Sequence, residues 1–208
     1  MLYFIDDLIL PIKKGCQMKN GINLLIVLLV FLGSTFNLAQ ENEEATMAAW
    51  KEYMTPSEFH AEMAKYSGDY STENTMWIGP GTEPLTEKGE AKLEMILGGR
   101  YLKTSHFGSF MGTPFEGVGI DAFDNITKEV TSVWYDNMGT GAMIMKGSWD
   151  KASGKVSLKG TTTDPMSKMS TNVREVITYS NGNKIVVEMF NMSNGAEYKS
   201  MEMVCIKK

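Results

Sequence analysis

The sequence predicts an all-β fold in which about ten antiparallel strands follow one short helix and close into an up-and-down barrel. Three observations predict it. Ten segments of strand character follow residue 68, and no gap between them is long enough for a helix. The breaks between the segments are turn sequences. Two of these breaks contain Asn-Gly, at 181–182 and 194–195, which is the pair most typical of a tight β-hairpin.

Short turns make each expected strand the antiparallel neighbour of the next. A sheet of this length tends to curl, and closure removes its exposed edges. Ten strands enclose more space than their own side chains fill, so we expect an interior cavity. Gly117 and Gly119 share one face of a strand, which favours sharp coiling and leaves space beside them. The expected strands span 69–78, 85–97, 100–110, 115–124, 129–137, 141–150, 155–163, 170–180, 183–192 and 196–206.

One helix is expected before the strands, over about residues 56–66. Thr55 and Glu58 have the spacing of a capping box, and Pro56 stands where a helix tolerates a missing N–H. Gly68 is expected to end the helix. His60 lies among acidic residues on this segment, and we expect it to face solvent.

The first forty residues have the pattern of a secretory signal peptide. Leu24 to Leu32 is an uninterrupted run of nine apolar residues, with Lys19 before it. That length suits a signal peptide better than a membrane span. Met18 is then a candidate native start, and cleavage is expected after Ala39. An uncleaved membrane anchor is the competing interpretation.

Removal of residues 1–40 leaves an acidic lead-in over 41–54 and one expected domain over 55–208. The remaining chain carries 17 basic and 23 acidic residues, or −6, and no basic stripe. Nucleic acid and anionic membrane surfaces are therefore not expected partners. Only Cys205 is left, which excludes an internal disulfide. The expected location is secreted or periplasmic, with no membrane contact beyond the signal segment.

Several blocks of sequence resemble a known family in their order and spacing. They are "MWIGPGTEP", "LGGRYL", "MGTPFEGVGIDAFD", "VWYDNMGT", "GSWDKASGKVSLKGTTTDP" and "EYKSMEMVCIKK". This series resembles domain-of-unknown-function family fifteen-seventy-nine, from about residue 55 to the C-terminus. The family is similar to calycin-type barrels, which include lipocalins and fatty-acid-binding proteins. "YSGDY" is similar to the Gly-x-Trp that opens a lipocalin barrel, but Tyr70 replaces the tryptophan. The resemblance implies a barrel and no known activity.

No catalytic, cofactor or metal motif is present. The sequence lacks a GxSxG elbow, a phosphate-binding glycine loop, HExxH, Cys-x-x-Cys and an EF-hand loop. Calycin-type haem proteins use a histidine near the C-terminus, and this chain has none there, so haem is not expected. We therefore predict no catalytic residue, no cofactor and no metal.

Six residues are candidates for contacting a ligand. His106 either points into the cavity or is a structural histidine. Met143 and Met145 share a strand face and would line the cavity or fill the core, and with His106 they could bind Cu(I). The resemblance to fatty-acid-binding proteins implies that Arg174 and Tyr135 hold a carboxylate head group. The alternative places Arg174 outside, in an ion pair with Glu188.

We expect a secreted barrel, not an enzyme, that binds a small apolar or amphipathic molecule. An isomerase or hydrolase using the same cavity is the main alternative, with His106 or a buried carboxylate as base. A copper carrier and a structural scaffold are the remaining hypotheses.

Overall fold

The computed structural model describes residues 42–165 and 167–208. The expected signal peptide, 1–40, lies outside these residues. The chain divides into two units, Met1–Lys51 and Glu52–Lys208, and the second contains the barrel. Over the part of the chain that is described, no helix combines the length and the apolar character needed to cross a bilayer.

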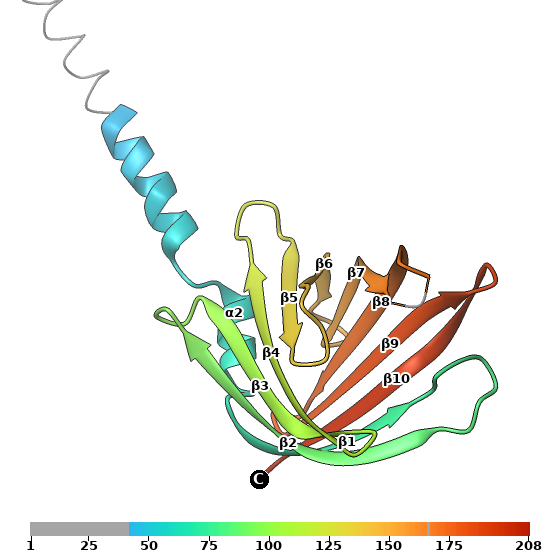
Figure 1. The fold of residues 1–208 in the computed structure, drawn as a ribbon. Helices are drawn as coiled ribbons and strands as arrows, with labels where there is room; N and C mark the ends of the chain where they lie inside the picture. Colours follow the sequence, from blue (N-terminus) through green and yellow to red (C-terminus); the bar gives the residue numbers. More distant parts are fainter. Residues whose placement is uncertain (1–41, 166) are drawn as a thin grey trace, which may run out of the picture. The chain divides into compact units, whose positions relative to one another are not determined.

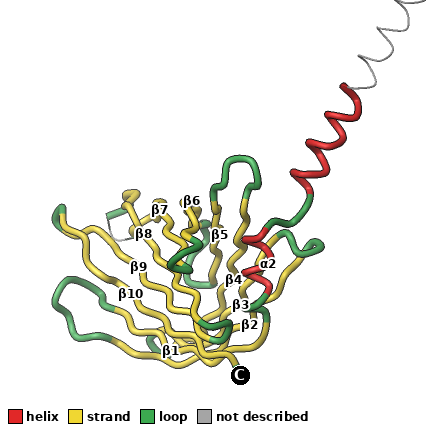
Figure 2. Tube along the Cα trace, turned by 180° about the vertical axis from the view of Figure 1, so that it is seen from behind, coloured by secondary structure: helices red, strands yellow, loops and turns green. Residues whose placement is uncertain are grey.

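Ten strands form a closed antiparallel barrel, as the sequence predicts, and each pairs with its neighbours along the chain until β10 pairs with β1. Figure 1 shows the strands winding around a common interior, and Figure 2 shows the same barrel from behind. Every expected strand is present within two residues of its expected bounds. The strands are β1 (Gly68–Met76), β2 (Leu85–Ile96), β3 (Tyr101–Phe110), β4 (Thr113–Phe123), β5 (Val130–Asp136), β6 (Met143–Asp150), β7 (Lys155–Asp164), β8 (Met169–Ser180), β9 (Lys184–Ser193) and β10 (Ala196–Lys207).

The hairpin turns have the backbone geometry that their residues favour. Asn181 and Gly182 both have positive φ, 53° and 69°, and so do Asn194 and Gly195, at 49° and 80°. Two successive residues with positive φ match the right-handed twist of the strands they join, and Asn-Gly adopts this conformation at low cost. The two Asn-Gly breaks are therefore turns, as predicted.

The register divides the barrel residues into two rows. Opposed pairs place Tyr70 beside Ala91, Ala91 beside His106, and His106 beside Gly117. This set contains most of the buried residues, so we call it the inward row. The alternate residues form the outward row. Side chains two apart in a strand share a face, so the row of one residue fixes that of its whole strand unless a bulge intervenes. The inward row bounds the interior.

The helical segment before the barrel differs from the prediction in three ways. Residues 42–54 are also helical, because this stretch is rich in Glu, Ala and Met, which favour helix. Helix α2 covers Glu58–Ala64, so it starts later than expected, with Ser57 as its N-cap. His60 is 6% exposed, and the expectation that it faces solvent is wrong. Its Nδ1 accepts a hydrogen bond from the Ser57 backbone N–H at 2.9 Å, the role expected of Glu58.

Helix α2 and the turn after it cover one end of the barrel. Phe59 stacks on Phe123 at the end of β4, with ring centroids 4.7 Å apart. Tyr66 contacts Tyr179 at the end of β8, with centroids 4.8 Å apart. The Tyr70 hydroxyl, fully buried, donates to the Tyr66 carbonyl at 2.7 Å. We call this end the closed end. The opposite end, where the turn at 194–195 lies, is the open end.

The hydrophobic core fills the closed half of the interior. It consists of inward residues that are almost fully buried, together with residues of α2. The most deeply buried are Tyr70, Met63, Met145, Leu158, Val130 and Val156. The Tyr70 that replaces tryptophan in the opening motif therefore belongs to this core.

Candidate functional site

The inward row changes character toward the open end. Inward side chains there are only partly buried, among them Asn74, Trp134, Met143, Met189, Asn191 and Met203. Because these side chains point into the barrel, the surface they leave exposed borders the interior. The inward side chains of the open half are therefore less closely packed than those of the closed half.

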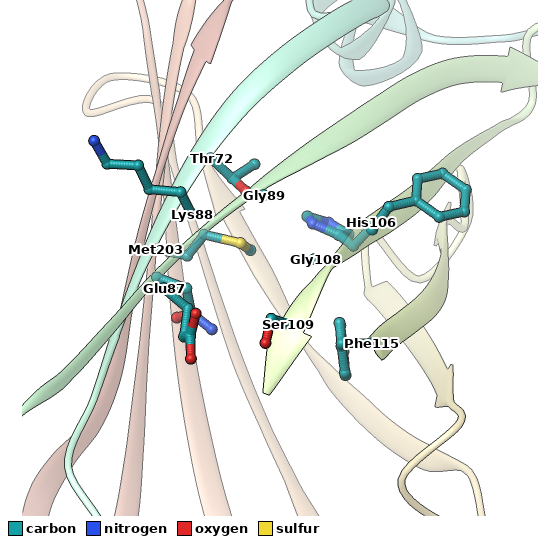
Figure 3. A pocket seen from close by; sticks show the side chains of 11 residues that line it. Thr72, Glu87, Lys88, Gly89, His106, Gly108, Ser109, Phe115 and Met203 are labelled. Carbon is teal, nitrogen blue, oxygen red and sulfur yellow. The ribbon is translucent and has the colours of Figure 1, made fainter. Parts of the chain in front are cut away.

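A small pocket of about 40 Å³ lies against β1, β2, β3 and β10 (Figure 3). This volume accommodates about three water molecules. Figure 3 shows His106 and Met203 turned toward this space, with Ser109 and Phe115 at its margin. The lining is Thr72, Asn74, Glu87, Lys88, Gly89, His106, Phe107, Gly108, Ser109, Phe115 and Met203. The pocket is too small to enclose a lipid, and its lining combines polar and apolar groups.

His106 is 7% exposed, and no described residue forms a hydrogen bond with its imidazole. Burial lowers the pKa of His106 to about 4, so the ring is neutral at physiological pH. A neutral imidazole has one donor and one acceptor nitrogen, and a buried polar group without a partner is costly. His106 can therefore donate to a ligand or accept from one.

Trp134 occupies the space beside the two glycines of β4. A Cβ at Gly117 would lie 2.3 Å from the Trp134 ring, and one at Gly119 would lie 3.3 Å from it. The ring centroid is 5.4 Å from that of His106, and the indole N–H donates to Asp136 Oδ2 at 2.8 Å. The two glycines therefore leave space beside them, as expected, and the Trp134 indole ring occupies this space and forms an aromatic wall.

Two carboxyl groups face the interior below this wall. Asp121 lies opposite Ser132 on the neighbouring strand, and Glu175 on β8 is 8% exposed. Burial raises the pKa of Asp121 to about 6. Burial, and then the charge of Asp121, raises the pKa of Glu175 to about 8. At neutral pH Glu175 is therefore mostly protonated, and it is ready to ionise if a cation approaches.

Two further inward groups have no partner. Asn74 Oδ1 on β1 and Asn191 Oδ1 on β9 are buried acceptor atoms without a hydrogen bond. Each lies on the inward row, because Asn74 pairs with Met203 and Asn191 pairs with Val173. The open half thus contains two buried acceptor atoms without a hydrogen-bond partner.

Three of the six candidate residues face the interior. His106 lines the pocket. Met143 and Met145 share the inward face of β6, as predicted from their spacing. Met145 is only 1% exposed and packs against Gly160, so it is part of the core, whereas Met143 is partly accessible. Among the described residues, no three His, Cys, Asp or Glu side chains are grouped so that they could hold a metal ion.

The other three candidates lie on the outward row, so the predicted carboxylate clamp is wrong. Arg174 forms a two-pronged ion pair with Glu197 at 2.9 and 2.6 Å and lies over the Phe190 ring. Tyr135 is 51% exposed. Glu188 does pair on the outer surface, but with Lys199 at 2.9 Å instead of Arg174. None of the three can hold a ligand inside the barrel.

Trp134, Asp121 and Glu175 are not among the six candidate residues predicted from the sequence. A signal for two of them was present. Asp121 shares a strand face with Gly117 and Gly119. If these glycines line the interior, the Asp121 carboxylate points into the interior too. Glu175 directly follows Arg174, and two adjacent strand residues face opposite sides, so one of these charges had to face inward.

The family profile described as "Protein of unknown function (DUF1579)" matches residues 55–207. No curated protein matches the sequence. The crystal structure of Rv2717c from M. tuberculosis is similar, with a TM-score of 0.54 and 13% sequence identity over 74% of this chain and 99% of that chain. At this identity the likeness supports the barrel fold alone.

Proposed function

This chain belongs to the DUF1579 family, whose function is unknown, and we propose that it binds a small amphipathic molecule inside its barrel. One observation carries the proposal. Inward side chains in the open half keep exposed surface, although the closed half of the same strands is filled. A sheltered space lined by methionine and tryptophan, with a few polar groups, is the usual form of a small-molecule site.

The arrangement suggests how the ligand lies. Its apolar body contacts Trp134, Met143 and Met189, whose side chains offer large or adaptable apolar surfaces. Its polar end reaches the pocket at His106, where the His106 imidazole and Asn74 Oδ1 have no hydrogen-bond partner. The ligand is small, because the core and α2 fill the closed end.

Uptake of an uncharged fluorescent dye, N-phenyl-1-naphthylamine, tests the proposal. We expect saturable binding of one dye per barrel, with a blue-shifted emission. Asn191→Trp places a large ring in the open half, and Met192→Trp is its matched control on the exposed outward row. We expect affinity to fall at least tenfold in the first variant and to stay unchanged in the second. Absence of dye uptake, or an equal loss in both variants, would refute the proposal.

One observation favours a second function, proton transfer to and from the bound molecule. The pKa of Glu175 is raised to about 8, so the group can both give and take a proton near neutral pH. Molecules that co-purify with the protein would be incubated with it in D2O. Deuterium gained at carbon with the native protein, and not with Glu175→Gln, would support an enzyme. Unchanged mass in both samples would leave binding as the function.

We also propose that the protein is exported, with residues 1–40 as its signal peptide. The apolar run Leu24 to Leu32 supports this. N-terminal sequencing of protein from the periplasm or the medium is expected to begin near Gln40. A chain that keeps residues 1–40 and stays with the membrane fraction would favour the anchor instead.

A further inference from the structure

We propose that the interior selects molecules that carry a cationic amine, and that Glu175 and Asp121 recognise this charge. The inference rests on the proposed function, because it names the chemical class of the ligand that the open half binds. Three features of the interior support it: the sign of its charges, the lack of partners for Glu175, and the unpartnered acceptor atoms of Asn74 and Asn191.

The inward row is acidic and almost without cations. Its charged side chains include Glu87, Asp121, Asp136 and Glu175. In the described strands its only Lys or Arg is Lys207, at the closed end, where its ammonium donates to the Lys65 carbonyl. The remaining strand cations lie on the outward row, and several pair there with carboxylates, as Lys199 and Lys146 do. A bound anion would meet several inward carboxyl groups, and the one lysine beside the pocket, Lys88, belongs to the outward row.

Glu175 is buried without a partner of opposite charge. The side chain is 8% exposed, and no described residue forms a hydrogen bond or an ion pair with its carboxyl group. Asp121 faces the Ser132 hydroxyl across the sheet and has no ion-pair partner among the described residues. Buried carboxylates are normally paired, so this pair lacks the cation that such groups usually have. An ammonium group supplies it.

The hydrogen-bonding groups of the open half favour the same class of ligand. Asn74 Oδ1 and Asn191 Oδ1 are buried acceptors without donors, and Glu87 adds a carboxylate at the pocket. A primary ammonium has three N–H donors and no acceptor, whereas a carboxylate has acceptors only. The apolar part of an amine can lie against Trp134, whose ring face also attracts a cation.

Amine binding is linked to proton release. At pH 7 the ligand enters as an ammonium ion while Glu175 carries a proton. When the two groups meet, Glu175 ionises and its proton leaves to solvent, so one ion pair forms and one proton is released. Calorimetry in two buffers of different ionisation enthalpy measures this proton.

Three ligands with the same octyl chain, n-octylamine, n-octanol and octanoate, test the inference by displacing N-phenyl-1-naphthylamine. We expect octylamine to bind at least tenfold more tightly than octanol. Octanoate should bind most weakly of the three. Octylamine is expected to release close to one proton at pH 7. Glu175→Gln should reduce the ratio of octylamine affinity to octanol affinity to about three or less, and it should abolish proton release. The affinity for octanol should not fall. Glu188→Gln is the matched control, because this glutamate lies on the outward row. This variant should leave the affinities for all three ligands and the proton release unchanged.

The outcomes separate this inference from the function on which it rests. Equal binding of the three ligands would overturn amine selection and leave interior binding intact. Failure of the dye and of all three ligands to bind would remove the proposed function itself. A preference for octylamine that survives in both Glu175→Gln and Asp121→Asn would overturn the assignment of the two carboxyl groups. Thermal unfolding of each variant confirms that it is folded, and the panel on the native protein tests the class of ligand without any variant.

Discussion

The two ends of the barrel are built from the same strands and the same inward row, yet they differ in packing and polarity. On β2, Leu93 near the closed end is 4% exposed, whereas Leu85 near the open end keeps much more of its surface accessible. On β8, Tyr179 contacts Tyr66 in the turn after α2, whereas Glu175, between the buried Val173 and Ile177, faces the interior without a partner. On β2 the position along the strand therefore sets how closely an inward side chain is packed, whereas on β8 the core extends past Glu175 to Val173.

The difference shows how this barrel combines stability with an accessible interior. Phe59 of α2 and Tyr66 in the turn after it add aromatic rings to the closed end, so the core there is complete without filling the other end. Polar and charged inward residues then cluster where little apolar packing is lost. The following predictions test this division, beginning with the largest effect.

Leucine truncation at the two ends of β2 should have unequal costs. Leu93→Ala removes a buried side chain from the core, and we expect the free energy of unfolding to fall by about 2–5 kcal/mol. Leu85→Ala removes a partly exposed side chain on the same row, and we expect a loss below about 1.5 kcal/mol. Urea denaturation measures both. Equal losses would contradict the distinction between the ends.

A methyl group at Gly117 should collide with Trp134. The added Cβ would lie 2.3 Å from the indole ring, so the ring must move. We expect Gly117→Ala to cost about 1–3 kcal/mol of unfolding free energy and to shift the tryptophan emission. Gly141→Ala is the control, because a Cβ there meets no atom within 4 Å. An unchanged Gly117→Ala variant would show that the indole does not occupy this space.

Glu175 should make the protein less stable as the pH rises from 6.5 to 8. Its pKa is about 8 in the folded state and 4.5 as a free side chain, so over this range the folded state holds a proton that the unfolded state has lost. The unfolded state binds fewer protons, and the free energy of unfolding falls, by an amount on the order of 1–2 kcal/mol. Glu175→Gln should not show this decrease. An identical pH dependence in both proteins would mean that Glu175 is not buried.

Removal of Arg174 should have the smallest effect. Its pair with Glu197 lies on the outer surface, where about a third of each side chain is exposed. Its stacking on Phe190 contributes little to the stability of the folded state. We expect Arg174→Ala to cost less than about 1 kcal/mol of unfolding free energy and to leave dye binding unchanged. A large loss of dye affinity would restore the arginine to a role in ligand binding.

The sequence predicts the fold well because its signals are local. Asn181-Gly182 and Asn194-Gly195 specify tight turns by their own backbone preferences, whatever surrounds them. Strand positions follow from these turns and from apolar runs. The barrel then follows from ten strands joined without a long connection.

The site is harder to predict because its features depend on which row faces inward. Segment 170–180 has apolar residues on both rows, so alternation alone does not choose between Arg174 and Glu175. The analogy with carboxylate-binding barrels favoured Arg174, and the structure has Glu175 inside. His60 shows the same limit in a helix, since its burial depends on Phe123 and the rest of the barrel end that α2 covers.

The methionine methyl groups provide the most direct test of an accessible interior at one end only. In protein labelled with ¹³C at these methyls, n-octanol should shift the resonances of Met143, Met189 and Met203, which lie on the inward row of the open half. Met145 in the core and Met192 on the outward row should not shift. Shifts confined to Met192 and other outward methionines, or no shift at any concentration of octanol, would contradict the account.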